Sequence, residues 1–390
     1  MENVLDERDQ WIVQALQLDG RASFEQIGRA LGLPAQTVAR RYQRLRADGT
    51  VRVVGRSPYW AVGGTPWLLR IQCTPDRADR IASALAGHPA TTWVRTSGGG
   101  EIVCGLRAGS AEEEENLLTR LDRTPRVVGF AAYCILHRFR AGRAPWRGWP
   151  APLDPAAAAR LTADQPEPST DAAPPQVGGR IARDGIKPDR PERVIRPPTP
   201  HPAAQGRAHR PQDAAQRRRP DLSPVDEHIL AELGRDGRTP VSDLAARVGV
   251  SESAARRRLR ALHETGVLHF EVDFDPRAVG MRTGAMLWLT VPPSALAEVG
   301  DTLAGHPDVS FAAATSGPVP LVVSLLLPDL AAVYAHLTGT VGALPAVSRA
   351  DTTIFTRTWK RQGGPPVTGQ SPTRRPGPPP FRGVPGRGPG

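Results

Sequence analysis

The sequence is poor in cysteine and in aromatic residues, and it contains no long apolar run. Its three cysteines stand far apart at positions 73, 104 and 134, so they provide no disulfide framework and fit a reducing compartment. No run of about eighteen apolar residues occurs, and the first residues are acidic where a secretion signal would be basic. We therefore expect a cytoplasmic protein that neither enters a membrane nor is exported.

Sequence signatures of catalysis are also missing. The chain has no glycine-rich phosphate loop, no HExxH and no GxSxG motif. The cysteines lack CxxC or Cys/His spacing, so we interpret them as small buried hydrophobic residues. His88 and His306 both stand in the sequence LAGHP, where the following proline favours a turn role over a ligand role. We predict no enzyme activity, no catalytic residues, no cofactor and no metal.

Proline, glycine and positive charge are abundant instead. The 390 residues include 41 prolines and 39 glycines, and the formal net charge is +11. Residues 141–220 carry fourteen basic and eight acidic residues, and residues 361–390 carry five arginines and no acid, so these two segments hold the entire excess. With sixteen prolines and little apolar periodicity, 141–220 is predicted to be a flexible linker, and 361–390 a disordered basic tail.

The remaining sequence is an internal duplication. The stretch Leu33–Gly49, LPAQTVARRYQRLRADG, aligns without a gap with Val250–Gly266, VSESAARRRLRALHETG, at an offset of 217 residues. Downstream, AVG, LAGHP and TSG recur in the same order with small gaps. The chain therefore contains two copies of one unit, and each copy has two parts.

The first part of each copy has the pattern of a helix-turn-helix domain. Apolar spacing predicts helices over 5–18 and 24–31, a glycine turn, and a third helix that buries Val38, Tyr42 and Leu45. The alternating segment 50–54 follows at the usual place of a wing. We predict winged helix-turn-helix domains over 1–56 and 221–275.

The second part of each copy has a different pattern of apolar residues. Between residues 67 and 140, apolar strand patterns and two helical patterns follow one another in the order βαββαβ. This order predicts an α+β, ferredoxin-like sandwich with both helices on one face of an antiparallel sheet. We place the two domains at 61–140 and 278–360.

This two-part unit resembles the Lrp/AsnC family of transcriptional regulators. The resemblance is carried by LDERDQWIVQALQLDGR and IGRALGLPAQTVARRYQRLRADGTV, and in the second copy by DEHILAELGRDGR and LAARVGVSESAARRRLRALHETGVL. It implies a sequence-specific regulator that binds double-stranded DNA and senses a small molecule through its second domain, the RAM domain, with an amino acid as the expected effector. The duplication predicts an intrachain pseudo-dimer and leaves open further homo-oligomers.

The third helix of each copy is the predicted reading helix. In the first copy, its face opposite the apolar stripe would enter the major groove, with phosphate contacts on its flank and from the wing. The predicted DNA contacts of the first copy are Gln36, Thr37, Arg40, Arg41, Arg44 and Arg52. Those of the second copy are Ser253, Arg256, Arg257 and Arg260. Because Ala254 and Ala261 replace Thr37 and Arg44, we expect weaker or altered reading there and unlike half-sites.

The effector loop is predicted from the resemblance. The segment RTSGGGEIVCGL lies where the family has its Thr-Gly-x-x-Asp loop, which implies effector contacts from Thr96, Ser97, Gly98 and Glu101. In the second copy the corresponding residues are Thr315, Ser316 and Gly317. This second loop, TSGPVPLVV, has no acid that could pair with a ligand ammonium group.

Two alternative functions remain open at this stage. Siroheme decarboxylases are similar in fold, but the corresponding region, ATTWVRTSGGGEIVCGL, lacks the run HNYxRxxxYNxWFT that those enzymes carry. The second alternative is an architectural DNA-binding protein that has no effector. Bound tetrapyrrole would be visible by absorbance, and thermal-shift screening of amino acids would separate a regulator from an architectural protein.

Overall fold

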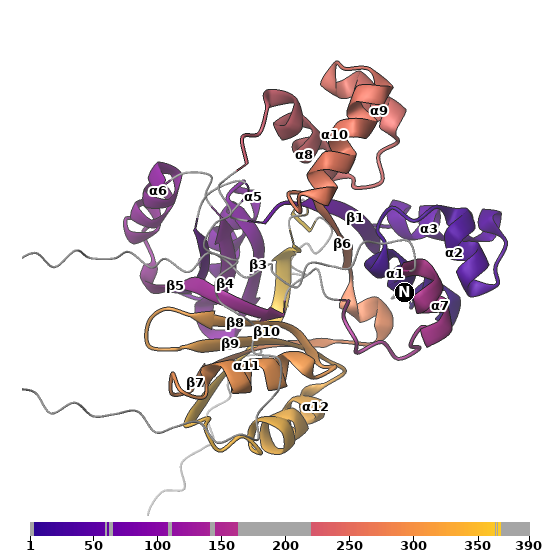
Figure 1. Cartoon of the computed structure of the whole chain (residues 1–390). Helices are drawn as coiled ribbons and strands as arrows, with labels where there is room; N and C mark the ends of the chain where they lie inside the picture. The colour runs from indigo at the N-terminus through magenta and orange to yellow at the C-terminus, as the bar shows by residue number, and fades with distance from the viewer. Residues whose placement is uncertain are drawn as a thin grey trace, which may run out of the picture.

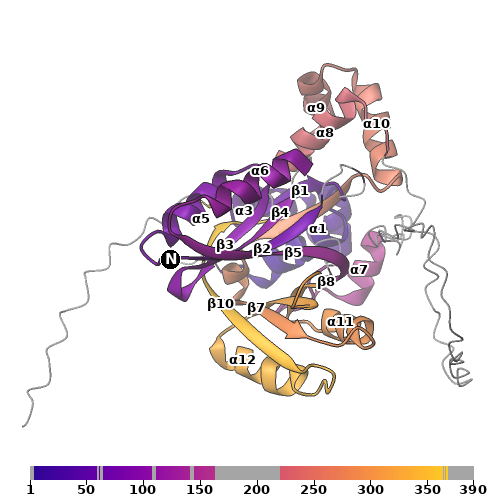
Figure 2. The same cartoon turned by 90° about the vertical axis from the view of Figure 1, so that its left-hand side faces the viewer.

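The two copies pair with each other in the computed structural model (Figures 1 and 2). The structure describes residues 4–58, 61, 65–107, 111–140, 145–162, 220–362, 364 and 366–367. Three helices form the first head: α1 (Glu7–Leu18), α2 (Phe24–Leu31) and α3 (Ala35–Ala47). Three more form the second head: α8 (Pro224–Arg235), α9 (Val241–Val248) and α10 (Glu252–Glu264).

Short-range interactions define the helix ends of the first head. Ser23 caps α2 in a reciprocal capping box with Gln26, through hydrogen bonds of 2.8 and 3.1 Å. The turn before α3 places Gly32 at φ 67°, a left-handed conformation that glycine adopts without a steric penalty. Pro34 precedes α3 and is its N-cap residue.

The predicted wings are wrong. Strand β1 (Val51–Arg56) pairs in antiparallel fashion with β6 (His269–Phe274) of the other copy, with Val53 opposite Val272. A wing would instead fold back on its own head as a hairpin. The alternation in the sequence correctly indicated a strand, but its partner lies more than 200 residues away, where local sequence carries no information about pairing. We call β1 and β6 the ribbon.

The eight remaining strands close into one barrel. The first copy supplies β2 (Pro66–Cys73), β3 (Thr91–Ser97), β4 (Glu101–Arg107) and β5 (Val127–Arg140). The second supplies β7 (Thr283–Thr290), β8 (Val309–Thr315), β9 (Leu321–Leu327) and β10 (Arg349–Lys360). The order around the barrel is β10-β3-β4-β2-β5-β8-β9-β7. The two expected sheets are therefore joined along both edges, with β5 pairing β8 and β10 pairing β3.

Helices cover the outer faces of the barrel (Figures 1 and 2). They are α5 (Ala78–Gly87) and α6 (Ala111–Asp122) on the first sheet, and α11 (Leu296–Gly305) and α12 (Leu330–Ala335) on the second. A π-helical segment, η4 (His336–Val341), continues α12. Each sheet buries one apolar cluster beneath its helices, and a third apolar cluster fills the space between the sheets.

The predicted flexible linker is wrong in its first part. Residues 145–162 pack against the first head and contain a further helix, α7 (Pro155–Thr162). Trp146 and Trp149 are each only 6% exposed and stack with Phe274 of the ribbon. The high proline content indicated a linker, but Trp146 and Trp149 supply enough apolar surface for this segment to pack. Residues 163–219 lie outside the described part of the chain.

The predicted basic tail also begins as packed structure. The Arg361 guanidinium lies 3.3 Å from Asp273 and 3.7 Å from Asp275, beside the ribbon. The backbone N–H of Val367 donates to the Trp359 carbonyl at 2.8 Å, and residues 368–390 lie outside the described part. Among the described helices, none combines the length and apolarity that crossing a membrane requires.

Candidate nucleic-acid interface and effector region

Helix α3 presents a polar face away from a buried stripe. Val38, Tyr42 and Leu45 are at most 3% exposed, as predicted, and they hold the helix against the first head. On the opposite side Gln36 and Arg40 are exposed and Thr37 is half-buried. Within the described residues Arg40 has no ionic partner, so its guanidinium can bind an external acceptor.

Two other predicted DNA contacts are engaged inside the first head. The Arg41 guanidinium lies 2.8 Å from Asp9 and 2.7 Å from Asp6, and its side chain is only 20% exposed. The hydrogen bond to Asp9, which has the larger effect, and the hydrogen bond to Asp6 raise the pKa of Arg41. Arg44 binds the second oxygen of Asp9 but keeps 54% of its side chain exposed. Arg41 therefore braces α3 against the beginning of α1, while Arg44 still faces solvent.

The second head repeats this brace at the equivalent positions. Arg258 lies 2.9 Å from Asp226, and these residues follow Arg41 and Asp9 by 217 positions. Burial acts to raise the pKa of Asp226, but hydrogen bonds from Ser223 and Arg258 outweigh it and hold the pKa below its ordinary value. The recurrence of an acid and an arginine at matched positions was the signal that would have identified this pair from the sequence.

The predicted reading face of α10 is open to solvent. Ser253, Arg257 and Arg260 are exposed, and neither arginine has an ionic partner among the residues that are described. Arg256 pairs with Glu252 one helical turn away, at 2.5 Å. Arg257 is therefore the counterpart of Arg40 in position, exposure and freedom from internal ion pairs.

The remaining predicted contact, Arg52, lies in the ribbon and not on a wing. Its guanidinium is 3.8 Å from Asp273, and its side chain is 27% exposed. Burial raises the pKa of Asp273 although Arg361 and Arg52 both oppose that rise. Arg52 thus belongs to a charged group on the ribbon between the heads.

Reciprocal hydrogen bonds join the turns of the two heads. Arg21 donates to the carbonyls of Gly237 and Thr239 at 2.7 and 3.2 Å. Arg238 donates to the carbonyls of Gly20 and Ala22 at 2.8 and 3.0 Å. Together with the ribbon, these bonds fix one head relative to the other through backbone atoms.

The first predicted effector loop lies at the seam between β3 and β10. Thr96 is 4% exposed, and its hydroxyl accepts a hydrogen bond from the Trp359 indole at 3.3 Å. Ser97 and Gly98 lead into the short η1 turn (Gly98–Gly100). The carboxylate of Glu101 already accepts hydrogen bonds from side chains of the barrel. Its partners are Arg70 at 3.1 Å, Thr353 at 2.7 Å and Gln72 at 3.2 Å.

The second predicted loop lies at the opposite seam, between β5 and β8. The N–H of Ser316 donates to the Cys134 carbonyl, and the N–H of Cys134 donates to the Ser316 hydroxyl, both at 2.9 Å. Thr315 is 3% exposed, and Gly317 adopts φ 85° beside Tyr133. Both loops therefore contact the other copy, and the side chains of Thr96, Glu101 and Ser316 are hydrogen-bonded within the barrel.

Large side chains occupy the space between the two sheets. Trp288 is 1% exposed, its indole donates to Thr353 at 3.1 Å, and the Arg70 guanidinium lies 4.8 Å from its ring centre. Tyr133 packs on Trp288 with ring centres 5.3 Å apart. An eight-stranded barrel is about wide enough for its own side chains, and here those side chains fill it.

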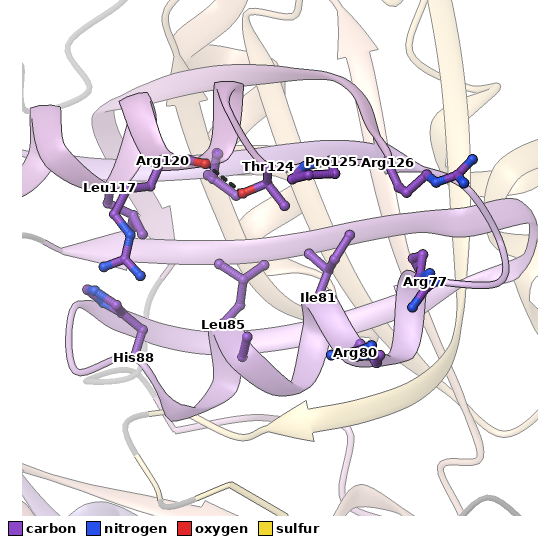
Figure 3. Close-up of a pocket in the computed structure, with 12 residues that line it drawn as sticks. Arg77, Arg80, Ile81, Leu85, His88, Leu117, Arg120, Thr124, Pro125 and Arg126 are labelled. Carbon is purple, nitrogen blue, oxygen red and sulfur yellow. Dashed lines mark hydrogen bonds between the residues drawn. The ribbon is translucent and has the colours of Figure 1, made fainter.

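A pocket of about 500 Å³ lies elsewhere, between α5 and α6 on the outer face of the first sheet (Figure 3). Ile81, Leu85 and Leu117 are among its apolar lining residues. Its basic residues are Arg77, Arg80, His88, Arg120 and Arg126. None of the predicted effector residues lines it. Sequence reasoning missed this pocket because its walls come from two helices far apart in the chain.

Two protein-family models match this chain. The AsnC-type helix-turn-helix domain matches residues 5–46 and again residues 222–263. The Lrp/AsnC ligand binding domain matches residues 284–365. The matches cover both heads and the second copy's part of the barrel.

The relatives include proteins named as HTH-type transcriptional regulators. The HTH-type transcriptional regulator FL11 of Pyrococcus horikoshii is 29% identical over 140 residues, which cover 36% of this chain and 92% of that protein. The HTH-type transcriptional regulator AldR of Mycolicibacterium smegmatis is 39% identical over 80 residues, or 20% of this chain and 47% of that protein.

One solved structure is similar over almost the whole chain. The siroheme decarboxylase NirDL is 15% identical, with 93% of this chain and 95% of that chain covered and a TM-score of 0.55. At this identity the likeness concerns the fold alone.

Proposed function

Because it carries two AsnC-type helix-turn-helix domains and an Lrp/AsnC ligand-binding domain, this chain belongs to the Lrp/AsnC family, and we propose that it is a transcriptional regulator that binds DNA with both heads. The observation that carries the proposal is the equivalence of Arg40 and Arg257. Both stand on the exposed face of the third helix of a head, and both are free of internal ion pairs in the described structure.

The first head is the principal reader in this proposal. Arg40 and Arg44 can bond guanine O6 and N7, and Gln36 can pair with adenine, while Thr37 lies beside them on the same face. The second head offers Ser253, Arg257 and Arg260, with Arg256 on its flank. The first head thus carries the larger set of base-reading groups, which supports an operator with unlike half-sites.

We assign Arg41 and Arg52 different roles from those the sequence suggested. Arg41 is held by two carboxylates, so releasing it to a phosphate would leave Asp9 with a weaker set of partners. Arg52 lies in the ribbon between the heads and near Asp273. We therefore propose that Arg41 maintains the head and that Arg52 supports the ribbon.

The pairing of the heads within one chain is the second part of the proposal. A family member with one unit per chain needs two chains to present two heads, whereas this chain presents two heads joined by the ribbon and by Arg21 and Arg238. We propose that one chain occupies two half-sites, and that homo-oligomers would add further pairs of heads.

The effector in this proposal is a small metabolite, with an amino acid as the family expectation. Glu101, the acid available in the first loop, is bound by Arg70, Gln72 and Thr353, and the second loop has no acid. An amino acid would have to displace Arg70 from Glu101 to pair its ammonium group there. Thermal-shift screening of amino acids with the full chain tests this step, and no response to any of them would favour the effector-independent architectural protein.

A siroheme-decarboxylase-like enzyme is the second candidate, because the likeness to NirDL spans both copies. The filled interior around Trp288 and Tyr133 argues against it, since a tetrapyrrole needs space that these side chains occupy. Incubation with iron-porphyrin or siroheme followed by gel filtration tests it. A protein-bound tetrapyrrole absorbance would support the enzyme, and its absence would support the regulator.

Selection from a random duplex library with the full chain tests DNA reading. A shared motif should emerge, and the double variant Arg40→Ala, Arg257→Ala should bind it at least about tenfold less tightly. Arg123→Ala is the matched control, because Arg123 is exposed on the barrel side of the molecule. No enriched motif, or equal binding by the double variant, would contradict the proposal.

A further inference from the structure

A cluster of two histidines and an aspartate lies in the second copy, at the turn between α11 and β8. His306 and Asp308 stand in this turn, and His336 begins η4 at the end of α12. The Asp308 carboxylate oxygen Oδ2 lies 3.1 Å from Nδ1 of His336 and 3.5 Å from Nδ1 of His306. Each side chain offers one ligand atom, and these atoms all lie within 4.8 Å of one another.

His336 is buried without a full set of partners. Its side chain is 1% exposed, and its Nε2 has no hydrogen-bond partner. A buried polar atom without a partner costs free energy and calls for an explanation. Apart from Asp308, no described group forms a hydrogen bond with the ring. Its Nδ1, which faces Asp308, is the nitrogen placed to bind an ion beside that carboxylate.

The first copy shows that the turn itself needs only the histidine. It reads LAGHPA at 85–90, whereas the second copy reads LAGHPD at 303–308. In both copies the histidine Nδ1 accepts a hydrogen bond from the backbone N–H two residues later, at 3.2 Å from Ala90 and 3.3 Å from Asp308. The predicted turn role of His306 is confirmed by this bond. This backbone hydrogen bond does not account for the carboxylate of Asp308 or for His336.

We propose that His306, Asp308 and His336 bind one divalent transition-metal ion, a site beyond the DNA-reading function. Bond lengths of about 2.0–2.2 Å in a tetrahedral zinc site place neighbouring ligand atoms roughly 3.3–3.5 Å apart. The distance of 3.1 Å from Asp308 Oδ2 to His336 Nδ1 is close to that separation. His306 Nδ1, 3.5 Å from the same oxygen, would exchange the hydrogen bond that it accepts from the Asp308 N–H for the ion. Two imidazoles and one carboxylate are a donor set suited to zinc and to iron(II).

The site is accessible to an ion from solvent. The side chains of His306 and Asp308 are 31% and 30% exposed, while His336 closes the inner side. A bound ion would keep its remaining position for water. It would also join the α11–β8 turn to η4. Asp308 and His336, which lie in these two segments, are 28 positions apart in the sequence. Metal binding would therefore hold α12 and η4 on the outer face of the second sheet.

Titration of the full chain with metals tests the site. After removal of metals with a chelator, zinc is titrated by calorimetry, and cobalt(II) is followed through its visible absorption. We expect about one ion per chain with micromolar or tighter affinity, and a higher unfolding temperature when zinc is present. Asp308→Ala and His336→Gln should each weaken this binding at least about tenfold and abolish the temperature shift.

The controls come from the chain itself. Asp308→Ala gives the second turn the sequence LAGHPA, which the first copy already folds with the same backbone hydrogen bond, so the variant should retain its structure. His88→Gln changes the matching histidine of the first copy, beside which Ala90 stands, and should leave metal binding unchanged. Circular dichroism of each metal-free variant verifies the fold.

The proposal is overturned by any of three results. The first is that the wild-type chain binds no zinc or binds it only at millimolar concentrations. The second is that Asp308→Ala binds zinc as tightly as the wild type. The third is that His88→Gln loses as much affinity as His336→Gln. In each of these cases the cluster is a hydrogen-bonded group in which Asp308 serves the two imidazoles without an ion.

Discussion

Arg21 and Arg238 stand 217 positions apart, and each donates two hydrogen bonds to the turn that contains the other. Each guanidinium also lies over an aromatic ring, Arg21 over Phe270 and Arg238 over Phe24 and Tyr42. Burial, followed by the mutual repulsion of the two charges, lowers the pKa of Arg21, and burial lowers that of Arg238. These two arginines connect the heads at equivalent places.

Removing either arginine should loosen the heads. Arg21→Ala or Arg238→Ala leaves two partly buried carbonyls without a donor, which should reduce the free energy of unfolding by roughly 1–3 kcal/mol. Urea unfolding of the full chain measures it. Arg235→Ala is the control, because Arg235 is an exposed residue at the end of α8 that pairs only with Glu232 among the described residues. Equal midpoints for Arg21→Ala, Arg238→Ala and the control would refute the connection.

The two reading helices should contribute unequally to DNA affinity. Arg40→Ala should cost about 1–3 kcal/mol of binding free energy, whereas Arg257→Ala should cost less, because alanines replace Thr37 and Arg44 beside it. Electrophoretic mobility shift at fixed salt with the selected duplex measures both. If the two substitutions cause the same loss, the asymmetry of the heads is wrong.

Arg41 and Arg44 should separate stability from DNA binding. Arg41→Ala removes the brace to Asp6 and Asp9 and should lower the free energy of unfolding by roughly 1–3 kcal/mol. Arg44→Ala leaves that brace in place and should mainly weaken DNA binding. Urea unfolding and mobility shift of both variants test this. The opposite pattern, a stable Arg41→Ala chain with lost DNA binding, would return Arg41 to the interface.

The brace of the second head should be sensitive to acid. Hydrogen bonds from Ser223 and Arg258 outweigh burial and lower the pKa of Asp226 from 3.8. A lowered folded-state pKa gives stability that is complete above the unfolded value and is lost as the pH falls through the folded value. Asp226→Asn should therefore reduce stability at neutral pH and flatten its decline below about pH 4.

Unfolding temperatures between about pH 3 and pH 7 measure this effect. Asp243→Asn is the control, because Asp243 is exposed on α9 and, among the described side chains, forms a hydrogen bond only with Ser242. A wild-type profile that parallels that of Asp226→Asn at every pH would show that the carboxylate does not contribute.

The cysteines should react slowly in the folded chain. Burial raises the pKa of Cys104 to about 12 and also raises that of Cys73, so neither forms much thiolate at neutral pH. Cys134 is only half-buried and should react first with a thiol reagent. All three should react at once in denaturant. Immediate reaction of Cys104 in the native chain would contradict its burial in the first sheet.

Much of the local structure could be predicted from the sequence, because it depends on residues close together in the chain. The cap at Ser23, the turn at Gly32 and the stripe of Val38, Tyr42 and Leu45 all follow from spacing of a few residues. Pairing could not be predicted in this way. The strand at 51–56 has its partner in the other copy, and its hydrogen bonds leave no trace in its own sequence.

The candidate sites were partly hidden for the same reason. The exposed arginines of α3 followed from helical periodicity, but the use of Arg41 depends on Asp6, the N-cap of α1, and on Asp9 within α1. The histidine cluster joins residues from two separate elements, so no ligand spacing appeared in the sequence. The packing of 145–162 depends on Trp146 and Trp149, whose apolar area outweighs the prolines around them.

The central claim is that one chain presents two paired heads to one operator. Light scattering of the chain bound to a duplex with the selected pair of half-sites measures the mass of the complex. The paired-head arrangement predicts one chain of 41.9 kDa for each pair of half-sites. Two chains for each pair of half-sites, with one head of each chain left unbound, would contradict it.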